Sequence, residues 1–353
     1  MFKSCISFVL YCVIISACGR TVYVDSAHIM DNKYDSEYPS LPTSEYLDEI
    51  SNSVKLVNII VSYRVFDFSI KSNITDKNLD DDYLSKVAMD DSYVTSPASG
   101  TATIIYNYGQ RIALMSCAHI FNFPDTVIIY QRDPLGQVLP YLQSVYFKIE
   151  QHITVPGLPE ISNYEILVSD VDKDIAVLGK AYKDPAMMGF MPFKYPKGNA
   201  SELMPGTFVF LFGYPRGIQM VSRAIVGQAN RDKEHNFIMD AAVHNGISGG
   251  PVFALRDGVP NFELVGMIFA IAGEQLNFLA PDDSHNYEAN KLNKYTGDIY
   301  LKSTRQIVYG ITYAKSMESI ENFFSDNYEV FLNKGYNSKF FLTRNENVIQ
   351  NQD

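Results

Sequence analysis

Short apolar runs separated by polar turn residues dominate the chain from residue 54 onward. Many of these runs are rich in Val, Ile, Phe and Tyr, which favour β-strands. Many short strands with turns between them are typical of a β-barrel or sandwich. We expect strands near 54–66, 100–106, 111–116, 126–130, 138–149, 163–170, 175–178, 207–212, 221–229, 237–243, 251–255, 263–271 and 307–314.

The predicted strands fall into two groups. Residues 183–206 are rich in Pro, Gly and Met and indicate a linker between the groups. Polar residues at 69–98 predict a long surface loop with a short helix, and those at 272–298 predict an insertion. The apolar residues of 317–324 recur at helical spacing and predict a short helix. The pattern therefore predicts an all-β fold in two halves, followed by this helix.

The N-terminus carries the pattern of an export signal. Lys3 precedes the apolar run 5–17, which is too short to span a bilayer but suits a signal peptide over residues 1–17. Ile15-Ser-Ala-Cys18 resembles a bacterial lipobox, which implies that Cys18 is acylated and becomes the first mature residue. A plain signal peptide cut nearby is the alternative. Residues 18–50 are polar and predict a tether. The expected location is the cell envelope, with the protein held at a membrane by lipid.

Composition narrows the possible partners. The chain of 353 residues has a net charge of −11 and no Lys/Arg block, which argues against binding nucleic acid. The signal and lipidation account for three of the four cysteines, so Cys117 is expected to be a buried thiol without a disulfide partner. No cofactor or metal is predicted, because no pair of histidines has metal-ligand spacing with a third ligand among His152, His235, His244 and His285.

A serine among glycines supplies the first candidate chemistry. Ser248 lies in the segment 240–251, between Gly246 and the pair Gly249–Gly250. Glycines permit a sharp turn that presents the serine hydroxyl and directs the N–H groups of Gly246 and Ser248 to one point. A nucleophile and such an oxyanion hole are what acyl transfer requires. An ordinary Gly/Ser hairpin loop is the alternative.

Two further segments supply a base and a carboxylate. His119 follows the apolar run 111–115, and Asp174 opens the run 175–178. A serine hydroxyl needs an imidazole to take its proton, and the imidazole needs a carboxylate to fix its tautomer. Taken singly, His119 could be an ordinary polar residue and Asp174 a strand start. Together with Ser248 they follow the chain order of chymotrypsin-type enzymes.

The chain resembles the trypsin-like peptidase domain of the HtrA (Deg) group from about Val54 to Phe324. The resemblance implies a two-barrel, chymotrypsin-type peptidase domain over 51–324, with one barrel at about 51–182 and the other at about 204–315. The tail 325–353 is too short for the PDZ domain that many of these proteases carry. The resemblance rests on Cys117–His119, Asp174–Leu178, Gly213–Gly217, Asp240–Ala242, Gly246–Pro251 and Glu263–Met267.

The resemblance also implies roles and a specificity. His119, Asp174 and Ser248 would be catalytic, and the strand 266–271 would pair with an extended polypeptide substrate. Ala242 would form the base of the specificity pocket, with Ile268 and Ala270 on the facing strand, which predicts cleavage after small or aliphatic residues. Because Ile247 stands where these proteases usually carry Asn or Asp, we keep two hypotheses. One is a secreted, lipid-anchored serine endopeptidase and the other a protease-fold binding protein. The sequence leaves the oligomeric state open.

Overall fold

The computed structural model describes residues 30–77, 79–133, 136–161, 164–183, 189–281 and 297–337. The predicted signal peptide and Cys18 lie outside these residues, as does most of the predicted C-terminal tail. The described residues from Asn32 onward belong to one compact unit. Among them, no helix is long and apolar enough to cross a membrane.

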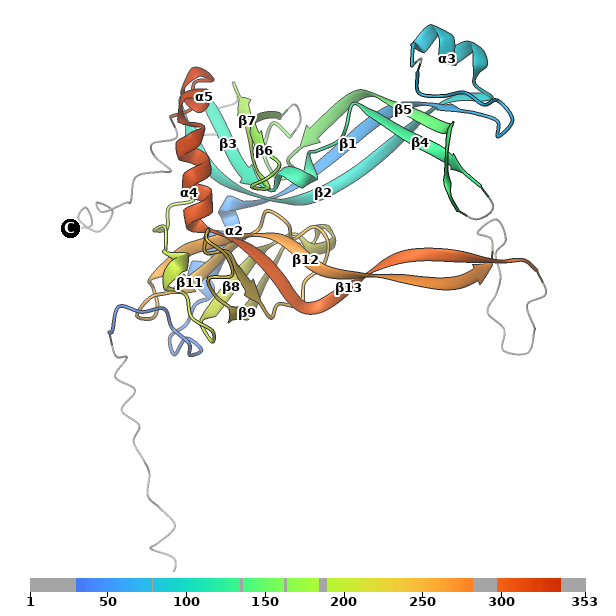
Figure 1. The fold of residues 1–353 in the computed structure, drawn as a ribbon. Helices are drawn as coiled ribbons and strands as arrows, with labels where there is room; N and C mark the ends of the chain where they lie inside the picture. Colours follow the sequence, from blue (N-terminus) through green and yellow to red (C-terminus); the bar gives the residue numbers. More distant parts are fainter. Residues whose placement is uncertain are drawn as a thin grey trace, which may run out of the picture. The chain divides into compact units, whose positions relative to one another are not determined.

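Two antiparallel sheets form most of this unit (Figure 1). The first has seven strands in the order β4-β5-β1-β2-β3-β7-β6. Its strands are β1 (Val54–Asp67), β2 (Asp90–Tyr108), β3 (Arg111–Ser116), β4 (Thr126–Arg132), β5 (Val138–Thr154), β6 (Glu165–Asp170) and β7 (Ile175–Ala181).

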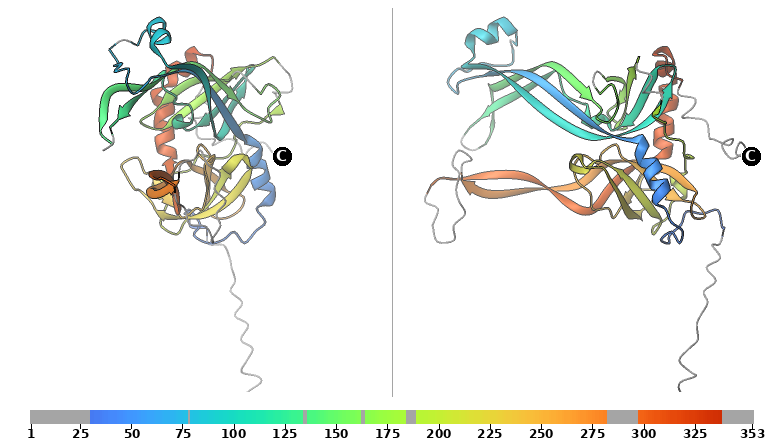
Figure 2. Two further views of the ribbon diagram at one scale, coloured as in Figure 1. Left: turned by 90° about the vertical axis from the view of Figure 1, so that its right-hand side faces the viewer. Right: turned by 180° about the vertical axis from the view of Figure 1, so that it is seen from behind.

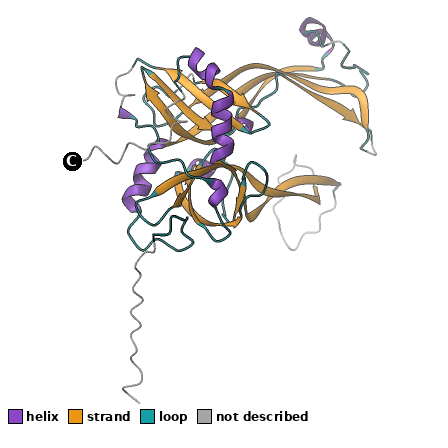
Figure 3. Ribbon diagram, turned by 60° about the vertical axis from the view of Figure 1, so that its left-hand side comes forward, coloured by secondary structure: helices purple, strands orange, loops and turns teal. Residues whose placement is uncertain are grey.

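The second sheet closes into a barrel in the order β10-β13-β12-β11-β8-β9. Its strands are β8 (Phe208–Gly213), β9 (Met220–Gln228), β10 (Phe237–Met239), β11 (Pro251–Leu255), β12 (Phe262–Pro281) and β13 (Ile299–Ser316). Helices are few and short beside these strands (Figure 3). The prediction of a trypsin-like, mostly β fold with two barrel-like sheets is confirmed.

Three strands, β2, β12 and β13, are much longer than the apolar pattern predicts. β2 begins at Asp90, within the predicted loop 69–98, and pairs with β1 over fourteen positions. β12 continues to Pro281, within the predicted insertion 272–298, and pairs with β13. The right-hand view of Figure 2 shows the β12–β13 ribbon extending away from the barrel. Main-chain hydrogen bonds hold such exposed ribbons, so their side chains show little of the alternation that a half-buried strand requires. The short helix expected in the first loop is α3 (Asp81–Val87).

The predicted C-terminal helix is α4 (Met317–Asp326). Ser316 caps it, since its hydroxyl accepts a hydrogen bond of 2.9 Å from the Ser319 N–H. The apolar residues that predicted the helix are buried in the main core cluster, Met317, Ile320, Phe323 and Phe324. A further helix, α5 (Tyr328–Asn333), follows within the predicted tail and buries Phe331 in the same cluster. The chain from residue 325 is therefore not wholly a tail.

The predicted tether, residues 18–50, is corrected over its described part. Ser44–Ser53 form helix α2, which buries Ile50. Further upstream, the Tyr34 hydroxyl donates a hydrogen bond of 2.6 Å to Glu263 and accepts one of 2.7 Å from the Asn199 N–H. The guanidinium of Arg256 lies 4.1 Å from the Tyr34 ring centroid. These contacts are long-range in the sequence, so the polar composition of the segment does not reveal them.

Candidate active site

His119 lies at the end of a buried strand. The strand β3 is buried from Ile112 to Ser116, and the 3-10 turn η1 (Ala118–Ile120) follows it directly. The neighbours Ala118 and Ile120 are buried, while the His119 side chain is 48% exposed. The strand end thus fixes the backbone and leaves the imidazole accessible at the surface.

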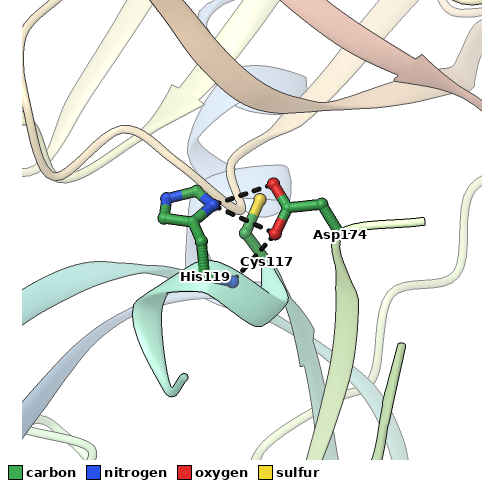
Figure 4. A group of neighbouring side chains, drawn as sticks. All are labelled: Cys117, His119 and Asp174. Atoms are coloured by element: carbon green, nitrogen blue, oxygen red, sulfur yellow. Dashed lines mark hydrogen bonds and ion pairs between the residues drawn. The ribbon is translucent and has the colours of Figure 1, made fainter. Parts of the chain in front are cut away.

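Asp174 orients the His119 imidazole (Figure 4). Its carboxylate oxygens lie 2.8 Å and 3.0 Å from His119 Nδ1, and one of them also accepts a 2.8 Å hydrogen bond from the His119 backbone N–H. Asp174 sits in the turn before β7 with φ of +55°. The alternative carboxylates are placed differently: Asp170 accepts the Lys173 N–H, and Asp172 is exposed. Asp174 therefore has the geometry required to hold His119 with Nε2 free to accept a proton.

Cys117 lies beside this pair, in an environment that keeps its thiol protonated. Its thiol is fully buried and donates a hydrogen bond of 3.2 Å to the Ile268 carbonyl. Burial, and then the charge of Asp174, raise the pKa of the Cys117 thiol well above its usual range. One ligand atom each from Cys117, His119 and Asp174 lie within 4.8 Å of one another. A cysteine binds metal as the thiolate, and this environment favours the protonated thiol, so the arrangement suits a His–Asp pair better than a metal centre.

Ser248 lies in the loop between β10 and β11, which is the serine segment of the sequence. Gly246 has φ of +98° and Gly249 has φ of +86°, values that side chains other than hydrogen rarely permit. Across the described residues, no intramolecular hydrogen bond uses the N–H of Gly246 or of Ser248. Two available N–H groups on one tight turn are the elements of an oxyanion hole.

In the described part of the structure, no hydrogen bond joins Ser248 to His119. Ser248 is partly buried. In substrate-free enzymes the catalytic hydrogen bonds are often long and tighten when substrate binds. The structure thus assembles the base and its orienting carboxylate and presents the serine on its turn.

The residues predicted to form the specificity pocket differ in accessibility. Ala242 is exposed and Ala270 is partly buried. Ile268 is fully buried and packs in the core cluster of the second barrel with Ala241 and Val243. Its side chain therefore belongs to the wall behind this region and presents no surface to a substrate. The pocket assignment stays a prediction for Ala242 and Ala270.

Ile247, the departure from the family pattern, has a packing role. Its side chain is 1% exposed and belongs to the core cluster of the second barrel. A Cβ added at Gly213 would lie 2.6 Å from Ile247 Cδ1, so the side chain packs closely on the end of β8. Apolar packing thus supports the loop at this position.

Sequence reasoning missed the residues that hold the serine loop. The Arg216 N–H donates 2.8 Å to the Asn245 carbonyl, and Thr101 on β2 contacts both Gly246 and Ser248 through hydrogen bonds. Thr101 is more than 140 residues from Gly246 in sequence. The only local signal was the short Gly-Pro-rich turn at 213–217, which the family resemblance had included.

The segment that carries these residues matches a known protein family. Residues 100–267 match the model of the family described as trypsin-like peptidase domain. The chain contains a trypsin-like peptidase domain. The matched residues of this peptidase domain include His119, Asp174 and Ser248. No curated protein gave a significant match to the sequence.

The solved structures that are similar to the chain include two proteases and one inactive mutant. An HtrA-type protease AlgW variant with a decapeptide is 16% identical with a TM-score of 0.46, covering 84% of this chain and 68% of its own. A serine endoprotease from Yersinia pestis is 14% identical with a TM-score of 0.37, covering 85% and 69%. An inactive serine-to-alanine mutant of Rv3671c from M. tuberculosis H37Rv is 12% identical with a TM-score of 0.39, covering 83% and 96%. All three TM-scores are below 0.5, so the assignment rests on the peptidase-domain match.

Proposed function

We propose that the protein is a serine endopeptidase that cleaves polypeptides through an acyl-enzyme. The observation that carries this proposal is the double contact of the Asp174 carboxylate with His119 Nδ1, at 2.8 Å and 3.0 Å. That contact leaves Nε2 as the proton acceptor. The serine turn adds the nucleophile and two available N–H groups.

The chemistry follows from these groups. His119 Nε2 takes the hydroxyl proton while Ser248 Oγ bonds to the carbonyl carbon of the substrate. The resulting oxyanion accepts hydrogen bonds from the N–H groups of Gly246 and Ser248. His119 then gives its proton to the departing amine as the C–N bond breaks, which leaves an ester on Ser248. Water activated by His119 hydrolyses that ester and restores the serine.

A fluorophosphonate probe tests the proposal, because it bonds only to an activated serine. We expect labelling of the folded wild-type protein and none of Ser248→Ala. Heat-denatured wild type is the control, since it keeps the serine without the His119–Asp174 pair. A folded, unlabelled wild type without peptidase activity would instead support the binding-protein hypothesis.

Substrate preference depends on the residues predicted to line the specificity pocket near Ser248. We propose cleavage after small or aliphatic residues, because Ala242, the exposed residue at the predicted pocket base, carries no charge. A buried Lys or Arg side chain without a carboxylate would be costly. Each fitting methylene should add about 1 kcal/mol, so selectivity should be graded. Profiling on a peptide library measures it, and a dominant Lys or Arg preference would contradict the proposed pocket.

The cellular placement is a separate proposal. We infer from the lipobox-like Ile15–Cys18 that the mature protein begins at an acylated Cys18 and is held at a membrane of the cell envelope. Several acyl chains together anchor a protein stably. Labelling with a palmitate analogue should mark the wild type and not Cys18→Ser. Equal labelling of both, or a mature N-terminus elsewhere by mass spectrometry, would refute the placement.

A further inference from the structure

Thr101 occupies an unusual position between the two sheets. It lies in β2 of the first sheet, and its side chain is fully buried. Its backbone N–H donates 2.8 Å to the Ser248 carbonyl, and its carbonyl accepts 2.6 Å from the Ser116 hydroxyl. Ser116 precedes His119 by three residues. One residue thus contacts both the serine loop and the strand that leads to the histidine.

The Thr101 hydroxyl makes two further hydrogen bonds. It donates 2.8 Å to the Gly246 carbonyl and accepts 2.9 Å from the Tyr214 N–H. A hydroxyl has one proton to donate, so the accepted bond from Tyr214 fixes that proton toward Gly246. The space around it is closed: a Cβ at Gly213 would lie 2.8 Å from this oxygen.

These contacts bear on the oxyanion hole because a trans peptide directs its N–H and C=O in opposite directions. The Asn245 carbonyl accepts from Arg216, which fixes the peptide that carries the Gly246 N–H. The Ile247 carbonyl accepts 2.9 Å from the Gly250 N–H, which fixes the peptide that carries the Ser248 N–H. The peptide between them carries the Gly246 carbonyl and the Ile247 N–H. The carbonyl accepts the 2.8 Å hydrogen bond from the Thr101 hydroxyl, and the N–H donates a longer one of 3.3 Å to the His244 carbonyl.

We propose that Thr101 is a positioning residue, whose hydroxyl aligns the Gly246 and Ser248 N–H groups toward the developing oxyanion. It does not touch the substrate, and it acts through the peptide between Gly246 and Ile247. This inference rests on the proposed serine peptidase function. Its consequence is that removing the hydroxyl lowers turnover more than substrate binding, since the oxyanion forms only during reaction.

The alternative role is structural, because any buried hydroxyl that satisfies two backbone groups stabilises the fold. Thr103 offers a matched control two residues along β2. It is 1% exposed, and its hydroxyl has no hydrogen-bond partner within the described part of the chain. Thr103→Val therefore replaces a buried threonine by valine without removing a hydrogen bond.

The test compares Thr101→Val, Thr101→Ser and Thr103→Val by kcat and KM on a peptide substrate, and by affinity for a peptide aldehyde that forms a tetrahedral adduct. Misplaced catalytic groups cost about 10²-fold in rate. We therefore expect Thr101→Val to lose about 10²-fold in kcat and in aldehyde affinity, with little change in KM. Thr101→Ser should restore most of both, and Thr103→Val should match the wild type.

Equal kcat and aldehyde affinity for Thr101→Val and Thr103→Val, with only a lower melting temperature for the former, would overturn the inference. If Thr101→Val does not fold, Thr101→Cys replaces it, since the thiol fills the site but donates weakly. A kcat of Thr101→Cys equal to that of the wild type would then also overturn the inference. A wild type that neither turns over peptide nor reacts with the fluorophosphonate would refute the proposed function instead.

Discussion

Asp174→Asn should lower kcat by about 10⁴-fold and leave the fold intact, as the same change does in the well-studied Ser-His-Asp proteases. The physical reason lies in the contact of the carboxylate with His119 Nδ1. An amide nitrogen there would donate to Nδ1 and place the ring proton on Nε2. That tautomer cannot take a proton from Ser248. Asn tolerates the positive φ of +55° at this position, so the backbone should persist.

The measurement is kcat on a peptide substrate together with the melting temperature. Asp172→Asn is the matched control, because it removes the same charge from an exposed residue in the same turn. It should keep wild-type kcat. His119→Ala and Ser248→Ala should lose at least as much activity as Asp174→Asn, because groups that act as a unit fail together. Near-normal turnover of Asp174→Asn would show that another carboxylate orients the base, with Asp170 the next candidate.

Gly249→Ala should abolish activity and destabilise the protein by roughly 4 kcal/mol or more, the range of severe core changes. Gly249 has φ of +86°, and a Cβ there would lie 2.0 Å from the Thr101 carbonyl oxygen and 2.4 Å from Ser116 Oγ. Neither β2 nor β3 can shift to relieve this clash, because both are paired on each side in the middle of the first sheet. The serine loop would have to move away from β2.

Gly157→Ala is the control that separates this clash from backbone strain. Gly157 has a similar φ of +84°, but nothing lies within 4 Å of the added Cβ. The free energy of unfolding of Gly157→Ala should fall by about 1–2 kcal/mol, because alanine is strained in the left-handed conformation. Its activity should be unchanged. Urea unfolding and fluorophosphonate labelling measure both variants. Equal destabilisation of the two would mean that the contact between Gly249 and β2 does not constrain the loop.

Local patterns in the sequence were enough for much of the fold. The apolar runs at 100–106 and 111–116 predict two strands, which the structure pairs as the β2–β3 hairpin. The helical spacing of Met317 to Phe324 likewise predicts α4. These patterns succeed because each element buries one face in the core, and burial forces apolar residues to recur at the period of that element. The same logic places His119 at the end of a buried strand.

Elements outside the core escaped such reasoning. The first ten residues of β2 and the outer half of β12 are mostly exposed, and their pairing rests on main-chain hydrogen bonds, which depend little on the identity of the side chains. Helix α2 also lies in a polar segment. A short window of residues carries no signal for the strand that it pairs with or the surface that it packs on.

The sequence by itself determined the candidate chemistry: Ser248 on a glycine turn, with His119 and Asp174 in a known chain order. Tertiary structure decided how the Asp174 carboxylate meets His119 Nδ1, that Ile268 is enclosed in the core, and that Thr101 holds the serine loop. The physical reason is the range of the interactions. Asp174 is 55 residues from His119, and their contact needs β3 and β7 to pair within the first sheet. Thr101 is 145 residues from Gly246, and their contact needs both sheets to have folded. Their geometry is set by chain packing, which no local pattern records.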